Sequence, residues 1–124
     1  MPIRFKIDHE KRLVHARTYG VMTIAHLEDY LDQVVVQGAM PYAKLYDNRE
    51  GTFEYDDKDM MLAGARISAY AALEPRGPVA IIAVTDPSIE VAKRFLNLGG
   101  PKRPGKIFQT EAAARRWLAT QPEA

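Results

Sequence analysis

The sequence of 124 residues contains no cysteine, which excludes disulfides, thiol catalysis and thiolate metal sites. It also lacks a long hydrophobic run. The longest strongly apolar stretch, residues 79–84, is far shorter than the roughly 20 residues that span a bilayer. Near the start of the chain, Arg4, Lys6 and Asp8 interrupt the apolar residues, so no signal-peptide core is present. These absences make the cytoplasm the expected location.

An excess of one charge is missing as well, because the formal net charge is only +1. Without a strong overall field, nucleic acid and anionic membranes are not expected partners. Hydrophobic residues make up 47% of the chain and charged residues 27%, which is the composition of an ordinary globular protein. Because a chain of this length can bury about two-thirds of its unfolded surface, residues 1–124 are expected to form a single domain.

The hydrophobic pattern predicts that the chain begins with two strands. Apolar and polar residues alternate in residues 3–8 and again in residues 13–19, as in strands with one buried face. The polar turn between them predicts an antiparallel hairpin. Thr23 is then expected to cap a helix whose apolar residues recur every three or four positions until Gly38.

The rest of the sequence alternates strands with helices. Three further strands are expected, at residues 42–46, 79–84 and 106–109, and a polar loop is expected at residues 47–52. The helices that follow are expected to begin at Asp56 or Asp57, at Asp86 and after Thr110. The order ββαβαβαβα predicts an α/β fold: a mostly parallel five-stranded sheet with an antiparallel edge and helices packed on its faces.

Two details of these helices are specific enough to test. In the helix that begins near residue 56, four residues are expected to form the stripe that faces the sheet: Met61, Ala65, Ser68 and Ala72. In the next helix, Asp86 is expected to be the capping residue, with Pro87 at the first helical position.

Three segments carry a family resemblance. Leu45-Tyr46-Asp47 closes a strand before a polar segment, the apolar residues 79–84 run into Asp86-Pro87, and Ala114-Arg-Arg-Trp117-Leu118 lies in the last helix. Together with the order of the elements, these segments resemble the SpoIIAA-like branch of the STAS domain family over nearly the whole chain. The resemblance implies the SpoIIAA/STAS fold.

The resemblance also carries expectations about function. Members of the signalling branch are non-enzymatic switches that bind an anti-sigma kinase and are phosphorylated on a serine where a strand loop meets the second helix. The matching residues 47–59 contain no serine, and Thr52 and Tyr55 are their only hydroxyls. The resemblance therefore implies a regulatory, protein-binding domain, without identifying its partner, its pathway or any phosphorylation of Thr52. Other members are grouped with lipid-binding SEC14-type domains, which implies a small apolar or lipid-like ligand as the alternative.

A binding site is expected beyond the carboxyl ends of the parallel strands, where α/β domains place their ligands. The candidate binding residues are Asp47, Arg49, Thr52, Tyr55, Asp56 and Asp86. The alternative is that these residues are structural, because aspartates cap turns and helices and Arg49 can pair with a neighbouring carboxylate. No Ser-His-Asp set and no acid-base pair is evident, so an enzyme is not expected. The three histidines lack the spacing of metal ligands, and no cofactor is expected.

Three other features leave alternatives open. Five aromatic residues either fill the core or, with Met60 and Met61, line an apolar pocket: Tyr42, Tyr46, Phe53, Tyr55 and Tyr70. Residues 100–106 have P-loop spacing, but Ile107 replaces the magnesium-binding Ser/Thr and the segment enters a strand, so a basic connector is expected. The first strand would pair with its copy in a homodimer if it lies at an open edge, although Arg4 and Lys6 discourage this.

Overall fold

The computed structural model describes residues 2–98 and 103–122. Its elements follow the predicted order: β1 (Ile3–Asp8), β2 (Leu13–Met22), α1 (Ile24–Val36), β3 (Ala43–Phe53), α2 (Asp57–Ala71), β4 (Val79–Ile82), α3 (Asp86–Leu96), β5 (Gly105–Phe108) and α4 (Glu111–Ala119). Residues 100–102 of the segment with P-loop spacing lie outside the described residues, and its last two residues, Gly105 and Lys106, begin β5.

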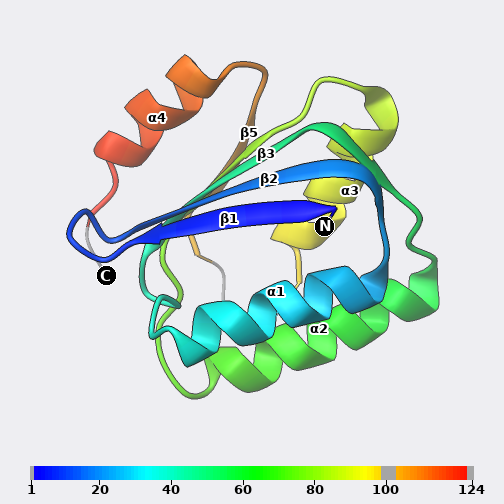
Figure 1. Cartoon of the computed structure of the whole chain (residues 1–124), viewed down its shortest axis with the longest axis horizontal. Helices are drawn as coiled ribbons and strands as arrows, with labels where there is room; N and C mark the ends of the chain where they lie inside the picture. The colour runs from blue at the N-terminus through cyan, green and yellow to red at the C-terminus, as the bar shows by residue number, and fades with distance from the viewer. Residues whose placement is uncertain (1, 99–102, 123–124) are drawn as a thin grey trace.

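The strands form one five-stranded sheet in the order β1-β2-β3-β4-β5. The β1–β2 pair is antiparallel and the other three pairs are parallel, as predicted. From β2 to β5, each strand lies next to the strand that precedes it in the chain, so the strand order advances in one direction. Because the connections between parallel strands share one handedness, the helices that they contain lie on the same face of the sheet. Figure 1 shows α1 and α2 side by side on that face, with α4 across the sheet from them. The α/β fold class is therefore confirmed.

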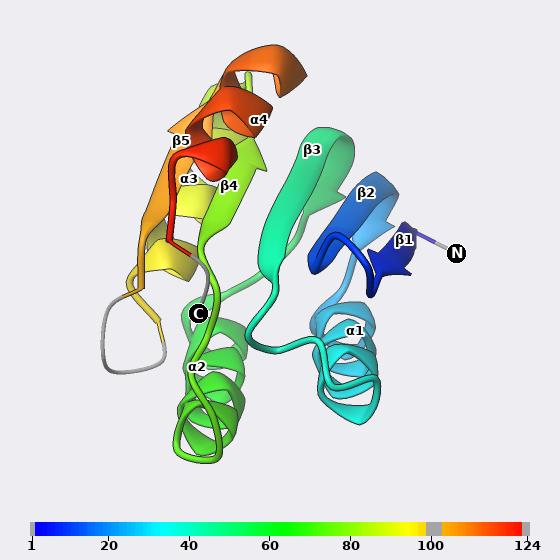
Figure 2. The same cartoon turned by 90° about the vertical axis from the view of Figure 1, so that its left-hand side faces the viewer.

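The sheet separates two hydrophobic cores. The larger core lies between the sheet and the helices α1 to α3, and it includes Val14, Tyr30 and Ile81. The smaller core lies under α4, where Leu45 and Ile82 contact the last helix. All four residues of β4 are buried, as its unbroken apolar pattern predicted. On the other face, α4 packs mainly on β3, β4 and β5, and Figure 2 shows it over that part of the sheet, away from β1.

The helices begin at the capping residues that the sequence suggested, with one correction. Thr23 and Asp56 cap α1 and α2 through reciprocal bonds, and Thr110 caps α4. The cap of α3 is Thr85, whose hydroxyl accepts a hydrogen bond from the backbone of Ser88, so the prediction that Asp86 is the cap is wrong by one residue. Threonine and aspartate are both good caps, and proline fits either of the first helical positions. The sequence therefore did not show whether the helix begins after residue 85 or after residue 86.

The polar segment 47–52 is strand, not loop. β3 continues to Phe53 and pairs with β2 as far as Met22, with a shift in register between Arg17 and Tyr19. Gly51 permits the close approach of the two strands, because a Cβ atom there would lie 2.2 Å from the Thr18 hydroxyl oxygen. The loop prediction failed because β2 extends beyond residue 19 and supplies backbone hydrogen-bond partners, and these outweigh the weak strand propensity of the polar residues.

The inward stripe predicted for α2 is also wrong. The four residues predicted to face the sheet are exposed: Met61, Ala65, Ser68 and Ala72. The buried residues of this helix are Met60, Ala63 and Ile67. The helix has small or apolar residues on both sides, so its own pattern does not determine which side is buried.

Candidate interaction site

Asp47, the first candidate, is buried on the side of the sheet that carries α4. Its carboxylate accepts hydrogen bonds from Arg49 Nε at 2.9 Å and Nη2 at 2.7 Å, and Arg17 Nε lies 3.9 Å away. The bonds from Arg49 hold the pKa of Asp47 below its usual value, against the opposing effect of desolvation. Arg49 therefore pairs with a neighbouring carboxylate, which is the structural role given above as the alternative to ligand binding.

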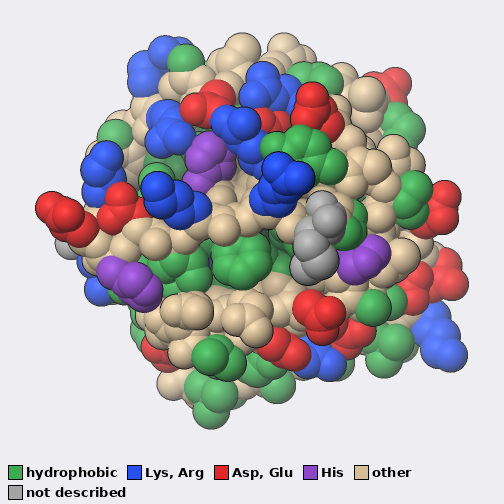
Figure 3. Space-filling view, viewed as in Figure 1, with side chains coloured by type: hydrophobic (Ala, Val, Ile, Leu, Met, Phe, Trp, Pro, Cys, Tyr) green, Lys and Arg blue, Asp and Glu red, His purple; other side chains and the backbone are tan. Residues whose placement is uncertain are grey.

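A network of charged side chains extends from this pair to α4. Arg17 lies 3.6 Å from Glu111, which accepts a bond from Arg115, and Arg115 Nη2 lies 3.4 Å from His15 Nδ1. Burial and then the charges of Arg115 and Arg17 lower the pKa of His15, so the ring is neutral near pH 7. Figure 3 shows lysine and arginine side chains gathered over β1 and β2 beside α4. These contacts link β2, β3 and α4, and they contain no nucleophile paired with a base.

Tyr55 lies on the opposite face of the sheet. Its hydroxyl is buried and has no hydrogen-bond partner among the described residues. Burial, and next the charge of Asp59, raise the pKa of Tyr55. The Tyr55 side chain lines an apolar pocket of about 50 Å³ between the sheet and α1, α2 and α3, and the polar residues that line this pocket include Thr18 and Asn48. Figure 3 shows hydrophobic side chains between β1 and α1.

The size of this pocket limits its contents. An engineered cavity of about 150 Å³ binds benzene, and a water molecule needs about 10–15 Å³. A pocket of about 50 Å³ therefore holds water or a molecule of a few atoms, but not a lipid in this conformation. Tyr46, Phe53 and Tyr55 both line this pocket and pack in or against the larger core, and Met60 also lines the pocket. The prediction that Met61 lines it is wrong, because this side chain is 75% exposed.

The six candidate residues do not meet at one point. Asp47 and Arg49 contact each other near α4, whereas Tyr55 lines the pocket beneath the helices. Asp56 accepts a bond from the Asp59 backbone as the cap of α2, and Thr52 and Asp86 are exposed. The structure thus brings together one pair, and it distributes the other four over the carboxyl ends of β3 and β4.

The outer face of α2 is a surface that the sequence did not single out. We define it as the exposed residues Met61, Leu62, Ala65, Ser68, Ala69, Ala72 and Leu73. Met61 and Leu73 are each 75% exposed and Leu62 is 50% exposed. Between residues 61 and 73 the only charged residue is Arg66, which pairs with Glu28 and Asp32 of α1 at 2.8 Å. The sequence signal for this surface is the shortage of charge between residues 61 and 73, in a helix with apolar residues on both sides.

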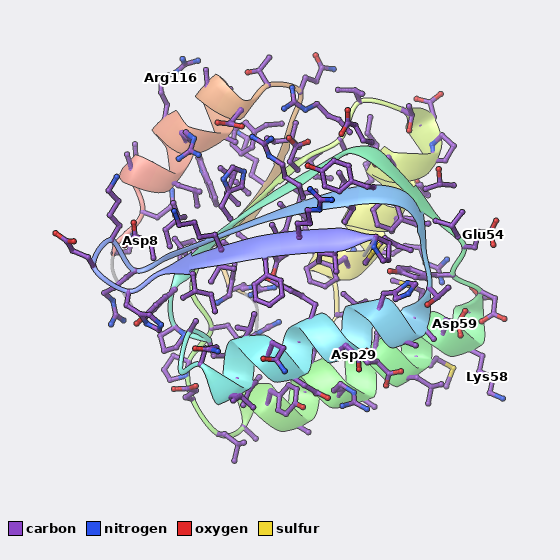
Figure 4. The ribbon with its side chains drawn as sticks, in the orientation of Figure 1. Asp8, Asp29, Glu54, Lys58, Asp59 and Arg116 are labelled. Carbon is purple, nitrogen blue, oxygen red and sulfur yellow. The ribbon has the colours of Figure 1, made fainter. Side chains whose placement is uncertain are left out.

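Charged side chains surround the start of the same helix. Figure 4 shows Glu54, Lys58 and Asp59 projecting at this corner of the molecule. Asp57 is fully in solvent apart from an ion pair with Arg94 at 2.9 Å. Among the residues that the structure describes, no group of three histidine, aspartate or glutamate side chains is placed to hold a metal ion. Within the same residues, no helix has the length and hydrophobicity needed to cross a membrane.

Comparison with known proteins gives a match in structure alone. No family model matches the sequence, and no curated protein matches it. The chain is similar to a solved structure described as "Structure of the Anti-Sigma Factor Antagonist SpoIIAA in its Unphosphorylated Form". The two share 16% sequence identity with a TM-score of 0.56, over 96% of this chain and 99% of the other. The expected SpoIIAA-like fold is therefore confirmed.

Proposed function

We propose that this domain, which has the fold of SpoIIAA, is a non-enzymatic regulatory domain that binds a partner protein through the outer face of α2. The observation that carries the proposal is the exposure of an uncharged helix face with Met61 and Leu73 each 75% exposed. A surface helix normally presents charged and polar residues to water. Exposed apolar surface of this kind is typical of protein interaction sites.

The charges beside this face indicate the chemistry of the partner. The start of α2 is acidic, with Asp57 and Asp59 in its first turn and Glu54 just before it. Acidic residues at the edge of an apolar surface favour a partner with basic residues at the matching positions. We therefore infer a partner surface with an apolar centre and a basic rim.

The structural neighbour supports a role in regulation. SpoIIAA is described as an anti-sigma factor antagonist, that is, as a protein that acts on another protein. In this chain, the proposed surface begins at Met61, in the second turn of α2, next to the acidic start of the helix. Asp47 and Arg49 are not part of it, because their side chains are committed to each other and to the contacts beside α4.

The test is site-specific photocrosslinking in the cells that make the protein. A photoreactive amino acid at Met61 should give a discrete crosslinked product with one protein, because this side chain lies in the proposed interface. The matched control is Val36, which is 76% exposed at the end of α1 and outside the proposed surface. Equal products from positions 61 and 36, or no product from position 61, would contradict the proposal.

A small ligand in the pocket beneath α1 is the second candidate function. The observation in its favour is the pocket itself, which is lined mainly by apolar and aromatic side chains, including that of Tyr55. The pocket volume restricts this ligand to a few atoms. Native mass spectrometry of gently isolated protein distinguishes the candidates, since a stoichiometric small-molecule adduct supports the ligand and a bare mass opposes it.

A further inference from the structure

A second pocket lies at the amino-terminal end of β3, away from the proposed interface. It has a volume of about 30 Å³ and is lined by three basic residues, Lys44, Arg76 and Arg103. The hydroxyl-bearing side chains of Tyr46 and Tyr70 complete its polar lining, and apolar residues of α1 and α2 form the remaining wall. Among the described residues that line it, none carries a carboxylate.

Lys44 is the most deeply buried of the three, with 2% of its surface exposed. Its amino group donates hydrogen bonds to the carbonyl oxygens of Met40 and Tyr42. Burial, followed by the charges of Arg103 and Arg76, lowers the pKa of Lys44 to about 6, and Glu74 acts weakly in the opposite direction. A neutral amine has two N–H groups, and both are used by these carbonyls, so its third position is a lone pair.

Arg103 stays charged at any ordinary pH. Its guanidinium lies 5.8 Å from the centre of the Phe95 ring, and no described carboxylate is within ion-pair distance of it. Burial lowers its pKa, which reflects the cost of holding this charge away from water. Desolvating an ion costs several kcal/mol unless a group of opposite charge compensates for it. The charge of Arg103 is therefore incompletely balanced by the described residues.

We propose that this pocket binds an oxyanion, a phosphate or carboxylate group, which Arg103 and Lys44 hold together. A guanidinium offers two parallel N–H donors that match the oxygen atoms of such a group. A pocket of about 30 Å³ admits the oxyanion group itself, so the rest of a larger ligand would project outside it. Lys44 takes up a proton from solvent when the anion arrives, and the new N–H is the donor that is directed at the ligand.

Isothermal titration calorimetry of the whole chain with inorganic phosphate and, separately, with acetate tests the proposal. The variants are Arg103→Gln and Lys44→Met, and the matched control is Arg116→Gln on the exposed side of α4. We expect Arg103→Gln to weaken binding by about tenfold or more, because a charge-assisted hydrogen bond is lost. Arg116→Gln should leave the affinity unchanged.

A second readout separates this site from general attraction to positive charge. In two buffers of different ionisation enthalpy at pH 7.5, titration with acetate, which is fully ionised at this pH, should show that the wild type takes up as much as about one proton per anion bound and that Lys44→Met takes up none. Binding of phosphate alone or of acetate alone supports the proposal and identifies the oxyanion. If neither anion binds more tightly than chloride, or if Arg103→Gln binds as the wild type does, the proposal is overturned.

Discussion

Lys44 joins the start of β3 to the turn before it, through bonds from its amino group to two backbone carbonyls. Because its pKa falls from 10.5 to about 6 in the folded protein, the unfolded chain binds more protons between these two pH values. The free energy of unfolding therefore rises with pH in this window by as much as about 1.4 kcal/mol per pH unit. Below about pH 6, Lys44 is charged in both the folded and the unfolded protein, and the loss of stability caused by burying its charge reaches its full value.

The substitution Lys44→Met should remove this dependence. Urea unfolding at pH 7, 8 and 9 should show that the stability of the wild type approaches or overtakes that of the variant as the pH rises. The variant itself should change less over the same range, because methionine does not titrate. Parallel curves for the two proteins would show that Lys44 is charged in the folded state.

At this scale, some of the important residues were predictable and others were not. The pairing of Arg49 with a carboxylate followed from two complementary charges placed two residues apart in the sequence. Lys44 was overlooked, although it lies between Tyr42 and Tyr46 on the inward side of a strand, where an alternating pattern predicts burial. Arg103 could not be placed, because the burial of a residue in a connector depends on packing between distant elements.

Among the elements, β3 is longer than its local hydrophobic pattern predicted. Its apolar residues 42–46 predicted a short strand, whereas the observed strand runs to Phe53. The polar half of β3 is held by pairing with β2, from Tyr19 opposite Glu50 to Met22 opposite Phe53. Pairing between strands that are 30 residues apart is not visible in the pattern of either strand.

The connector between α2 and β4 makes a close contact that can be tested. Gly77 donates a backbone hydrogen bond to Met40, and a Cβ atom at position 77 would lie 2.2 Å from the carbonyl oxygen of Tyr42. The substitution Gly77→Ala should therefore lower the free energy of unfolding by about 1–3 kcal/mol, since backbone atoms must shift. Chemical unfolding measures the change.

Gly64 provides the control for this substitution. It lies inside α2, and an added Cβ atom would meet only the end of the Leu98 side chain, at 3.3 Å. Alanine there should raise the stability by about 0.5–1 kcal/mol, because glycine is a poor helix former. Equal effects of alanine at positions 64 and 77 would contradict the importance of the contact with Tyr42.

For the whole molecule, the sequential order of the strands from β1 to β5 explains why the two faces of the sheet are covered by different numbers of helices. Three crossover helices occupy one face, and α4 alone packs on part of the other. The order of elements and the fold class were predictable, because they depend on periodicity and on the handedness of crossovers. Which face of α2 is buried depends on how the completed sheet packs, so the exposed face could be recognised only in the structure.

An open edge also follows from this arrangement. β1 is the first strand of the sheet and pairs only with β2, while Arg4 and Lys6 are exposed along it. Charged residues on an edge strand disfavour pairing with another copy. A homodimer through β1 stays a prediction, and the mass of the native assembly measures it.

The most direct test of the central claim is the dissociation constant of the partner identified by crosslinking, measured with purified proteins for Met61→Arg and for Val36→Arg. Our account predicts that Met61→Arg weakens binding by about tenfold or more, because it places a charge in an apolar interface. Val36→Arg should bind as the wild type does, and both variants should unfold at wild-type temperature. An unchanged dissociation constant for Met61→Arg would show that the outer face of α2 is not the interaction surface.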